Sequence, residues 1–160
     1  MKISYEFYPP KDMNYTKVVN EYSLIASHSP SFISITYGAM GGSQDRSIDL
    51  IKAFKNKTNV EIVAHLTLVG KSKSDLRTII ESFKTLGVNK IVALRGDSPE
   101  GKFHAHPDGF FNTSDFVKFL AGHELEVIVS AYPEPHPDSE GFDFDLKLLK
   151  EKTQAGSRHY

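Results

Sequence analysis

Short apolar segments recur along this chain at a nearly constant spacing, and this repeat restricts the fold more than any other feature. Each segment is rich in β-branched or aromatic residues and is flanked by polar residues, which is typical of a buried β-strand. The segments begin at residues 2, 31, 60, 89 and 125, so three intervals are 29 residues and the last is 36. The predicted strands are Lys2–Phe7, Ser31–Thr36, Val60–His65, Asn89–Leu94 and Leu125–Ala131.

Segments with helical spacing lie between these strands. The clearest is Lys73–Leu86, in which apolar residues recur every three or four positions, as on one face of an amphipathic helix. Ser74 or Ser72 can cap its start, and Gly87 can end it. Further helices are predicted around Ile48–Phe54, around Phe116–Leu120 with Ser114 as cap and Gly122 as stop, and over Asp145–Gln154.

Alternation of strand and helix with this period predicts an α/β fold with a parallel sheet and right-handed crossovers. Two architectures remain open. A five-stranded, doubly wound, flavodoxin-like sheet fits a chain of 160 residues. A (β/α)8 TIM barrel fits the repeat but typically needs about 250 residues, so this chain would supply five βα units of an incomplete barrel. No linker or low-complexity tract interrupts residues 1–160, which predicts a single domain.

Charge and composition exclude several classes of protein. Lys and Arg number 19 and Asp and Glu number 20, a net charge of −1, whereas proteins that bind nucleic acids or membrane surfaces carry a strong basic excess. The chain has no Cys, which excludes disulfides, iron–sulfur clusters and zinc–thiolate sites. Its first residues, MKISYEFYPPK, hold no long apolar run, so the sequence predicts neither a signal peptide nor a membrane span. We expect a soluble cytoplasmic protein.

Polar and aromatic side chains follow the carboxyl end of every predicted strand. Parallel α/β proteins place their chemistry at these ends, which meet at one rim of the sheet. The segments concerned are Glu6–Pro10, Thr36–Ala39, His65–Thr67, Arg95–Asp97 and Tyr132–Pro137. Because each βα unit delivers such a group to the same rim, we expect the functional site there.

Several rim residues have a structural explanation beside the functional one. Glu6 lies in an otherwise apolar strand, where an unpaired carboxylate is costly to bury. It can act as a general acid or form an ion pair with Arg95. His65 can contact a ligand or serve as a core histidine. Asp97 can contact a ligand, cap the following turn or pair with Arg95.

Three further motifs are weaker. His104 and His106 have a spacing that can chelate a metal, but no carboxylate stands in obvious register with them, so no metal site is predicted. Residues 38–42 follow a strand and precede a helix, as a phosphate loop would. They lack the glycine spacing of dinucleotide loops and the Lys-Ser/Thr pair of nucleotide loops. In the proline-rich segment with Glu134, His136 and Asp138, the prolines stiffen an extended loop, which favours positioned ligand contacts over a metal.

Five motifs at the strand ends resemble, in order, those of the methylenetetrahydrofolate reductase family. They are Tyr5–Pro10 (YEFYPP), Ile35–Ala39 (ITYGA), Ala64–Thr67 (AHLT), Ala93–Asp97 (ALRGD) and Ala131–His136 (AYPEPH). One motif falls in each βα unit, and the resemblance covers nearly the whole chain. It implies a (β/α)8 barrel that holds FAD at its carboxyl-terminal rim.

The resemblance also implies an activity. The family reduces 5,10-methylenetetrahydrofolate to 5-methyltetrahydrofolate in one-carbon metabolism and methionine biosynthesis, with NADH or NADPH as the electron source. The implied order is ping-pong, in which the nicotinamide reduces the flavin and leaves before folate takes the hydride. The flavin carries the redox chemistry, while the protein orients and polarises the reactants.

Site residues are carried over by the same resemblance. Glu6 matches the catalytic acid that assists opening of the folate's methylene bridge. Asp97 matches a residue near the flavin and the folate, which tunes the flavin and aids folate binding. The positions that match flavin contacts are Thr36, His65, Arg95, Gly96, Asp97, Tyr132, His136, Asp145 and Lys152. The cationic Lys152 suits the dinucleotide phosphates.

The chain departs from the family pattern at several positions. Asn112 stands where the family usually carries an aromatic residue before a helix. Leu148 and Glu151 stand where polar or basic FAD contacts are common, and Glu151 would repel a phosphate. After residue 156 the family continues into a sixth strand whose Gln binds folate, whereas this chain reads Ser157–Tyr160 and stops. Strands six to eight are therefore expected to be absent.

Three interpretations remain open from the sequence. The first is the reductase itself, with folate as substrate. The second is a truncated, catalytically inactive fragment that retains part of an FAD site. The third is a stand-alone, flavodoxin-like flavin-binding module. A five-stranded section of a barrel also leaves strand edges unpaired, which favours association between copies, so a homo-oligomer is one expected state.

Overall fold

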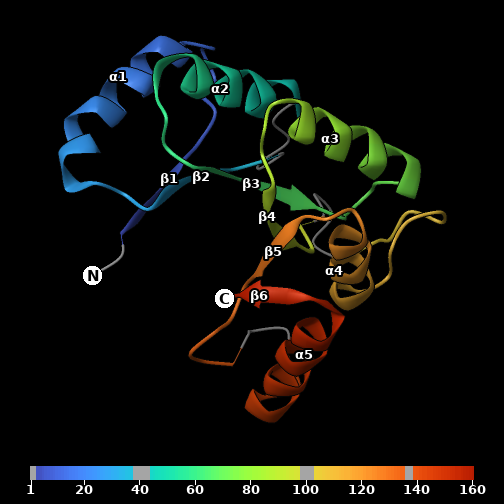
Figure 1. The fold of residues 1–160 in the computed structure, drawn as a ribbon. Coiled ribbons are helices and arrows are strands. Elements are labelled where there is room, and N and C mark those ends of the chain that lie inside the picture. Colours follow the sequence, from blue (N-terminus) through green and yellow to red (C-terminus); the bar gives the residue numbers. More distant parts are fainter. Residues whose placement is uncertain (1–2, 38–43, 98–102, 136–138) are drawn as a thin grey trace. The chain divides into compact units, whose positions relative to one another are not determined.

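A computed structural model describes residues 3–37, 44–97, 103–135 and 139–160 of the chain (Figure 1). The chain forms two compact units. The first comprises Met1–Leu66 with Arg77–Asn89, and the second comprises Thr67–Leu76 with Lys90–Tyr160. In both units helices and strands alternate along the chain, as the repeat predicts.

Parallel strands in the first unit lie side by side in the order of the sequence. Glu6 of β1 pairs with Ser34 of β2, and Ile33 of β2 pairs with Ile62 of β3. β2 therefore lies between the other two. The unit contains β1 (Ser4–Phe7), α1 (Tyr15–Ile25), the 3₁₀ turn η1 (Ala26–His28), β2 (Phe32–Ile35), α2 (Gln44–Lys57) and most of β3 (Ile62–Thr67) and α3 (Lys73–Thr85).

This strand order decides between the two predicted architectures. In a flavodoxin-like sheet the first strand lies between the second and the third, whereas here β2 occupies the middle position. The flavodoxin-like alternative is therefore wrong. Neighbouring parallel strands that follow the sequence order are the arrangement of a (β/α) barrel. The repeat could not distinguish the two, because both place one helix between successive strands.

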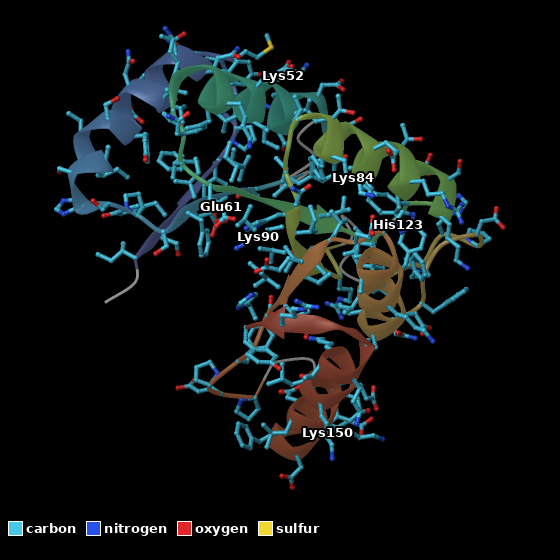
Figure 2. The ribbon with its side chains drawn as sticks, in the orientation of Figure 1. Lys52, Glu61, Lys84, Lys90, His123 and Lys150 are labelled. Carbon is cyan, nitrogen blue, oxygen red and sulfur yellow. The ribbon has the colours of Figure 1, made fainter. Side chains whose placement is uncertain are left out.

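The core of the first unit lies between its sheet and its helices. Ile35 of β2 and Phe54 of α2 have no exposed surface. The rings of Phe7, Tyr22 and Phe54 pack at steep angles with centroids 5.1 to 6.2 Å apart, a geometry that aromatic pairs favour. α1 packs against α2 (Figure 1). On the outer side of α2, Lys52 is exposed (Figure 2), so the helix buries one face only.

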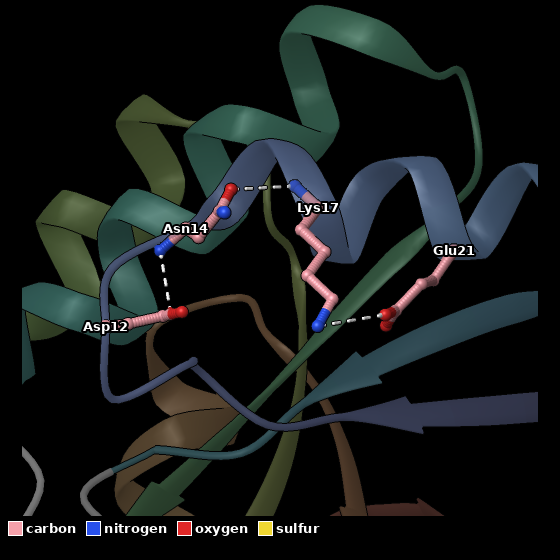
Figure 3. A network of polar contacts seen from close by, with 4 residues as sticks. All are labelled: Asp12, Asn14, Lys17 and Glu21. Atoms are coloured by element: carbon pink, nitrogen blue, oxygen red, sulfur yellow. Dashed lines mark hydrogen bonds and ion pairs between the residues drawn. The ribbon is translucent and has the colours of Figure 1, made fainter.

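Side-chain contacts determine where α1 begins (Figure 3). Asn14 Oδ1 accepts the backbone N–H of Lys17 at 3.1 Å and so caps the helix. The N–H of Asn14 donates in turn to the Asp12 carboxylate at 3.1 Å. One turn later, Lys17 and Glu21 form an exposed ion pair at 4.0 Å, which contributes little to stability.

The start of α3 carries a reciprocal cap, and Ser72 is the residue that makes it. Ser72 Oγ accepts the N–H of Asp75 at 3.1 Å, while the Asp75 carboxylate accepts the N–H of Ser72 at 2.9 Å. Just beyond the helix end, Gly87 has a φ of +67°, which confirms the predicted glycine stop.

Strands β4, β5 and β6 of the second unit are also parallel and also follow the sequence order. Ile91 of β4 pairs with Val127 of β5, and Val127 pairs with Ser157 of β6. The N–H of Leu68, just after β3, donates to the carbonyl of Leu94 at 3.1 Å. The elements are β4 (Lys90–Leu94), α4 (Thr113–Gly122), β5 (Glu126–Val129), α5 (Phe142–Ala155) and β6 (Ser157–His159).

The presence of β6 corrects the prediction of five strands with none after α5. Ser157 is buried at 6% exposure. The Glu126 carboxylate on β5 lies 3.2 Å from Lys90 Nζ on β4 and 2.6 Å from His159 Nε2 on β6, so this carboxylate links the three strands. The segment Ser-Arg-His has no apolar periodicity, which is why its pattern does not predict a strand.

Two helix starts also differ from prediction. α4 is capped by Asn112 rather than Ser114, because Asn112 Oδ1 accepts the N–H of Asp115 at 2.8 Å. α5 begins at Phe142, three residues before the predicted start at Asp145. In the described part of the chain, no helix combines the length and the apolar character needed to cross a membrane.

Candidate functional site

The ends of three strands in the first unit bring Glu6, Thr36 and His65 together. Thr36 Oγ1 donates to Glu6 Oε1 at 2.9 Å, and His65 Nδ1 lies 3.9 Å from the same oxygen. The side chain of Glu6 is 43% exposed, whereas that of His65 is 12% exposed. Glu6 is thus a carboxylate that solvent can reach and that a hydroxyl orients, rather than the buried group that its apolar strand predicts.

Parallel pairing of the strands produces this cluster. Glu6 faces Ser34 across the sheet, and the N–H of Thr36 donates to the carbonyl of Phe7 at 3.1 Å, so pairing continues one residue beyond β2. Ser47 Oγ on α2 donates to the Thr36 carbonyl at 2.8 Å and holds this strand end in place. The rim position of Thr36 therefore rests on backbone contacts as well as on its contact with Glu6.

Two opposing influences act on the His65 imidazole. Burial lowers the pKa of His65, and the nearby Glu6 carboxylate offsets this shift in part. The neutral imidazole, with one donor and one acceptor nitrogen, is therefore the form that the folded chain favours. The sequence leaves open whether His65 is a core residue or a ligand contact, and the structure combines both features. The ring is largely buried in β3, and Nδ1 faces Glu6.

A cavity of about 460 Å³ lies at the strand carboxyl ends of the second unit. This volume is within the range of small-molecule and cofactor sites. Its walls come from the ends of β4 and β5, from the start of α4 and from one side of α5. Of the residues that resemblance matches to flavin contacts, the lining includes Arg95, Gly96, Asp97, Tyr132, Asp145 and Lys152. Folding thus gathers residues that lie far apart in the sequence.

Two helix N-termini contribute to the cavity wall. Residues 112–114 line it at the start of α4, and Phe142 lines it at the start of α5. Backbone N–H groups in the first turn of a helix lack intrahelical partners and carry partial positive charge. Such termini favour anionic groups such as phosphates.

Gly96 is required by the close packing of two strand ends. Its φ is +81°, and a Cβ atom there would lie 2.6 Å from Val69 Cγ1 and 2.8 Å from Thr67 Cβ. Only glycine accommodates both the positive φ and this approach. Gly96 therefore has a structural reason to be glycine whether or not a ligand contacts its backbone.

Charges of both signs line the cavity. Burial lowers the pKa of Lys152, with Asp145 partly offsetting the shift. Arg95 is exposed, and its guanidinium lies 5.8 Å from the centre of the Phe103 ring. Glu151 also lines the cavity, so a negative charge stands next in sequence to Lys152. The acidic and basic groups together suit a ligand that carries both hydroxyl and phosphate groups.

The donor set fits a phosphate-bearing ligand with planar rings. Cationic side chains and helix N-termini can bind phosphates, and carboxylates can accept hydrogen bonds from hydroxyls. Aromatic side chains offer flat surfaces for rings, and the cavity presents three of them, Tyr132, Phe142 and Phe144.

Several candidate residues from the sequence are not seen in a functional site. His136 lies outside the described residues, as do Asp138 and the candidate phosphate loop at residues 38–42. His106 Nδ1 accepts the N–H of Asp108 at 3.1 Å, which gives that histidine a local role in its loop. Over residues 3–37, 44–97, 103–135 and 139–160, no group of three or more His, Asp or Glu side chains could hold a metal ion.

Phe142 and Phe144 line the cavity but were not identified as site residues from the sequence. One signal could have identified Phe142. Phe142, Asp145, Leu149 and Lys152 follow one another at spacings of three, four and three, which places them on one side of a helix. Phe142 therefore shares a face with two residues already matched to flavin contacts.

Parallel strands in sequence order, with polar side chains at their carboxyl ends, place this chain among TIM-barrel-like α/β proteins. A putative phosphonomutase from Burkholderia cenocepacia J2315 has a similar fold, with a TM-score of 0.63 at 12% identity over 99% of this chain and 66% of that one. The Yersinia pestis DHPS solved with a pterine-sulfa conjugate gives 0.54 at 14% identity, over 98% of this chain and 56% of that one. At such identities the similarity shows the fold alone.

The chain belongs to the methylenetetrahydrofolate reductase family, whose family model matches residues 1–160. The 5,10-methylenetetrahydrofolate reductase of Escherichia coli K12 is 36% identical over 98% of this chain and 52% of that protein. The maize methylenetetrahydrofolate reductase (NADH) 1 is 31% identical over 96% of this chain and 28% of that protein. The resemblance inferred from the five motifs is confirmed. The chain spans about half the length of its bacterial curated relatives.

Proposed function

We propose that this chain provides the flavin-binding part of an enzyme that reduces 5,10-methylenetetrahydrofolate to 5-methyltetrahydrofolate. FAD is the cofactor, and NADH or NADPH is the electron source. Family membership supports the reaction, and the name of the maize relative supports NADH. The chain covers 52% of its Escherichia coli relative. We also propose that residues 1–160 form a single barrel domain.

One observation carries the proposal: the cavity of the second unit gathers the polar groups that FAD would need. Six lining residues match flavin contacts of the family by sequence resemblance. Two strand ends and one helix supply them, namely Arg95, Gly96, Asp97, Tyr132, Asp145 and Lys152. Their location around one concave site of cofactor size supports the proposal.

The lining residues divide into roles by their chemistry. Lys152 and Arg95 would hold the phosphates, because cations pair with phosphate oxygens. Asp145 would accept hydrogen bonds from ribose hydroxyls. When bound, FAD supplies the hydride-transfer chemistry, while this chain's residues orient it. Tyr132, Thr36, His65 and His136 remain proposed flavin contacts.

Glu6 is the proposed acid. Thr36 donates to Glu6 Oε1 at 2.9 Å, which leaves Oε2 as the oxygen from which Glu6 would deliver a proton. From there Glu6 would protonate the nitrogen that leaves when the folate's methylene bridge opens. Its 43% exposed side chain leaves room for substrate to approach. Asp97, exposed on the cavity wall, is proposed to contact folate and flavin.

A second function deserves a separate test: binding of FAD without turnover. The flavin-site residues of the cavity all belong to the second unit, and the chain spans about half the length of its bacterial relatives. Binding of FAD by this part alone, without turnover, is therefore the second candidate.

Titration with FAD tests cofactor binding. We expect the purified chain to quench FAD fluorescence on binding. Lys152→Ala should weaken binding about 10- to 100-fold, the usual effect of losing a charge-assisted hydrogen bond. Lys150→Ala is the matched control, because Lys150 is exposed on the same helix (Figure 2) and is not a lining residue. A colourless protein that cannot be reconstituted with FAD would contradict the proposal.

Activity is tested by the two half-reactions under anaerobic conditions. We expect NADH to bleach the bound flavin and 5,10-methylenetetrahydrofolate to restore its absorbance. Glu6→Gln should abolish the second step and leave the first near normal, because only the folate step needs the acid proton. Binding of FAD without either step would support the inactive alternative. Loss of flavin bleaching in Glu6→Gln would show instead that Glu6 is structural.

A further inference from the structure

Two phenylalanine rings stand at the start of α5 and line the cavity of the second unit. Phe142 is 45% exposed and Phe144 is 37% exposed. Large aromatic side chains stabilise a fold mainly through buried area, and these two leave much of theirs in solvent. Because both rings lie in the wall of a cavity, their exposed area is accessible to a ligand bound there.

Helix geometry connects both rings to Lys152. Phe142, Asp145, Leu149 and Lys152 are spaced by three or four residues and form one ridge of α5. Phe144, Leu148 and Lys152 are spaced by four and form a second ridge. All of these residues line the cavity. One ridge therefore begins at Phe142 and the other at Phe144, and both end at Lys152.

The distance along the helix can be compared with the ligand. Eight to ten residues separate the rings from Lys152, which is about 12 to 15 Å of helix rise. Helical side chains lean back toward the N-terminus, and this holds for the rings as well as for the lysine, so their separation along the helix stays at about 12 to 15 Å. An adenine, its ribose and the pyrophosphate of FAD together extend over such a distance.

We propose that Phe142 and Phe144 form the stacking surface for the adenine base of FAD, with Lys152 at the phosphates. This inference rests on the proposed flavin-binding function. It assigns a binding role to two residues outside the family motifs. It also gives the dinucleotide a direction along α5, with the base at the helix N-terminus and the phosphates nearer to Lys152.

Other lining residues are less suited to hold the base. The side chain of Asn112 is used in the α4 cap, where it accepts the N–H of Asp115 and donates to the Asp115 carboxylate at 2.8 Å. Tyr132 is 51% exposed but follows β5, at the strand ends where the reacting ring is expected. The two rings on α5 are thus the flat surfaces left for a second planar group.

Ligands that carry only one half of FAD distinguish adenine stacking by the two rings from the proposed flavin binding. Wild type and Phe142→Leu/Phe144→Leu are titrated with FAD, FMN and ADP by fluorescence or calorimetry. Leucine keeps an apolar side chain but removes the ring. We expect the double variant to bind FAD and ADP about 5- to 100-fold more weakly, as loss of base–aromatic stacking does. Binding of FMN, which has no adenine, should not change.

Phe111→Leu is the matched control. Phe111 is 71% exposed in the same unit and is not a lining residue of the cavity, so it should leave all three affinities unchanged. Circular dichroism checks that each variant is folded, and single variants at Phe142 and Phe144 replace the double variant if it is not.

The outcomes test the stacking role of the two rings and the proposed flavin-binding function separately. Equal losses for FAD and FMN, or no loss for FAD and ADP, would overturn the stacking role. If wild type binds ADP but neither flavin, and the double variant loses ADP, stacking is supported while the flavin function fails. If wild type binds none of the three ligands, both are overturned.

Discussion

Replacing Gly96 with alanine tests whether the cavity wall depends on a close backbone approach. The φ of +81° is a left-handed conformation that costs an L-residue about 1–2 kcal/mol. The new Cβ would lie 2.6 Å from Val69 Cγ1 and 2.8 Å from Thr67 Cβ, so these side chains must move. Overpacking of this kind costs about 1–3 kcal/mol. Gly96→Ala should therefore lower the free energy of unfolding by about 2–5 kcal/mol.

Gly70→Ala separates backbone strain from steric overlap. Gly70 has a φ of +67°, and no atom lies within 4 Å of its ideal Cβ position. It belongs to the same compact unit as Gly96. Because both changes are glycine to alanine, their effects on the entropy of the unfolded chain cancel in the comparison. We expect Gly70→Ala to cost about 1–2 kcal/mol, the strain alone.

Urea unfolding followed by circular dichroism measures both effects. Gly96→Ala should be less stable than Gly70→Ala by about 1–3 kcal/mol, which is the overlap. FAD titration adds a second measurement, because movement of the Gly96 wall should weaken binding whereas Gly70→Ala should not. Equal destabilisation by the two substitutions would refute the argument from close approach.

Three further predictions concern the capping, titration and strand contacts. Asn112→Ala should lower the free energy of unfolding by about 1 kcal/mol through loss of the α4 cap, whereas Ser114→Ala should change it little; a larger loss for Ser114 would show that the cap is misassigned. Because the pKa of His65 is lowered on folding, the unfolded chain binds protons more readily, and stability should fall as pH drops through the unfolded His value of about 6.5. His65→Gln should show a smaller loss between pH 7.5 and pH 5 by urea midpoints, and an undiminished loss would contradict this origin. Glu126→Gln should speed amide hydrogen exchange in β6, because the charge that pairs with Lys90 and His159 is removed; unchanged exchange would mean that backbone pairing alone holds the strand.

The repeat was sufficient to predict the fold class because parallel strands are buried on both faces and so appear as apolar runs. β1 at Ser4–Phe7 lies within its predicted range, whereas β3 at Ile62–Thr67 begins and ends two residues later than predicted. The sequence predicted the presence of the strands better than their exact ends, since backbone pairing with neighbours decides where a strand stops. Ser157–His159 shows the same effect in a polar segment.

The candidate site was predictable to a different extent in the two units. The family resemblance matched Arg95, Asp97 and Lys152 to flavin contacts, and all three line one cavity. The same resemblance did not indicate that Glu6 would be 43% exposed. Exposure depends on which side chains pack over a strand end, and that information is not local in the sequence.

Local periodicity and short motifs were enough to predict the βα repeat, the location of the polar residues at the strand ends and the family. The folded chain was needed to learn that β2 lies between β1 and β3, that a sixth strand pairs with β5, and that Phe142 lines the same cavity as Lys152. The physical reason is that strand order, pairing of a polar strand and the lining of a cavity all depend on contacts between residues distant in the chain. Local patterns restrict such contacts but do not select among them.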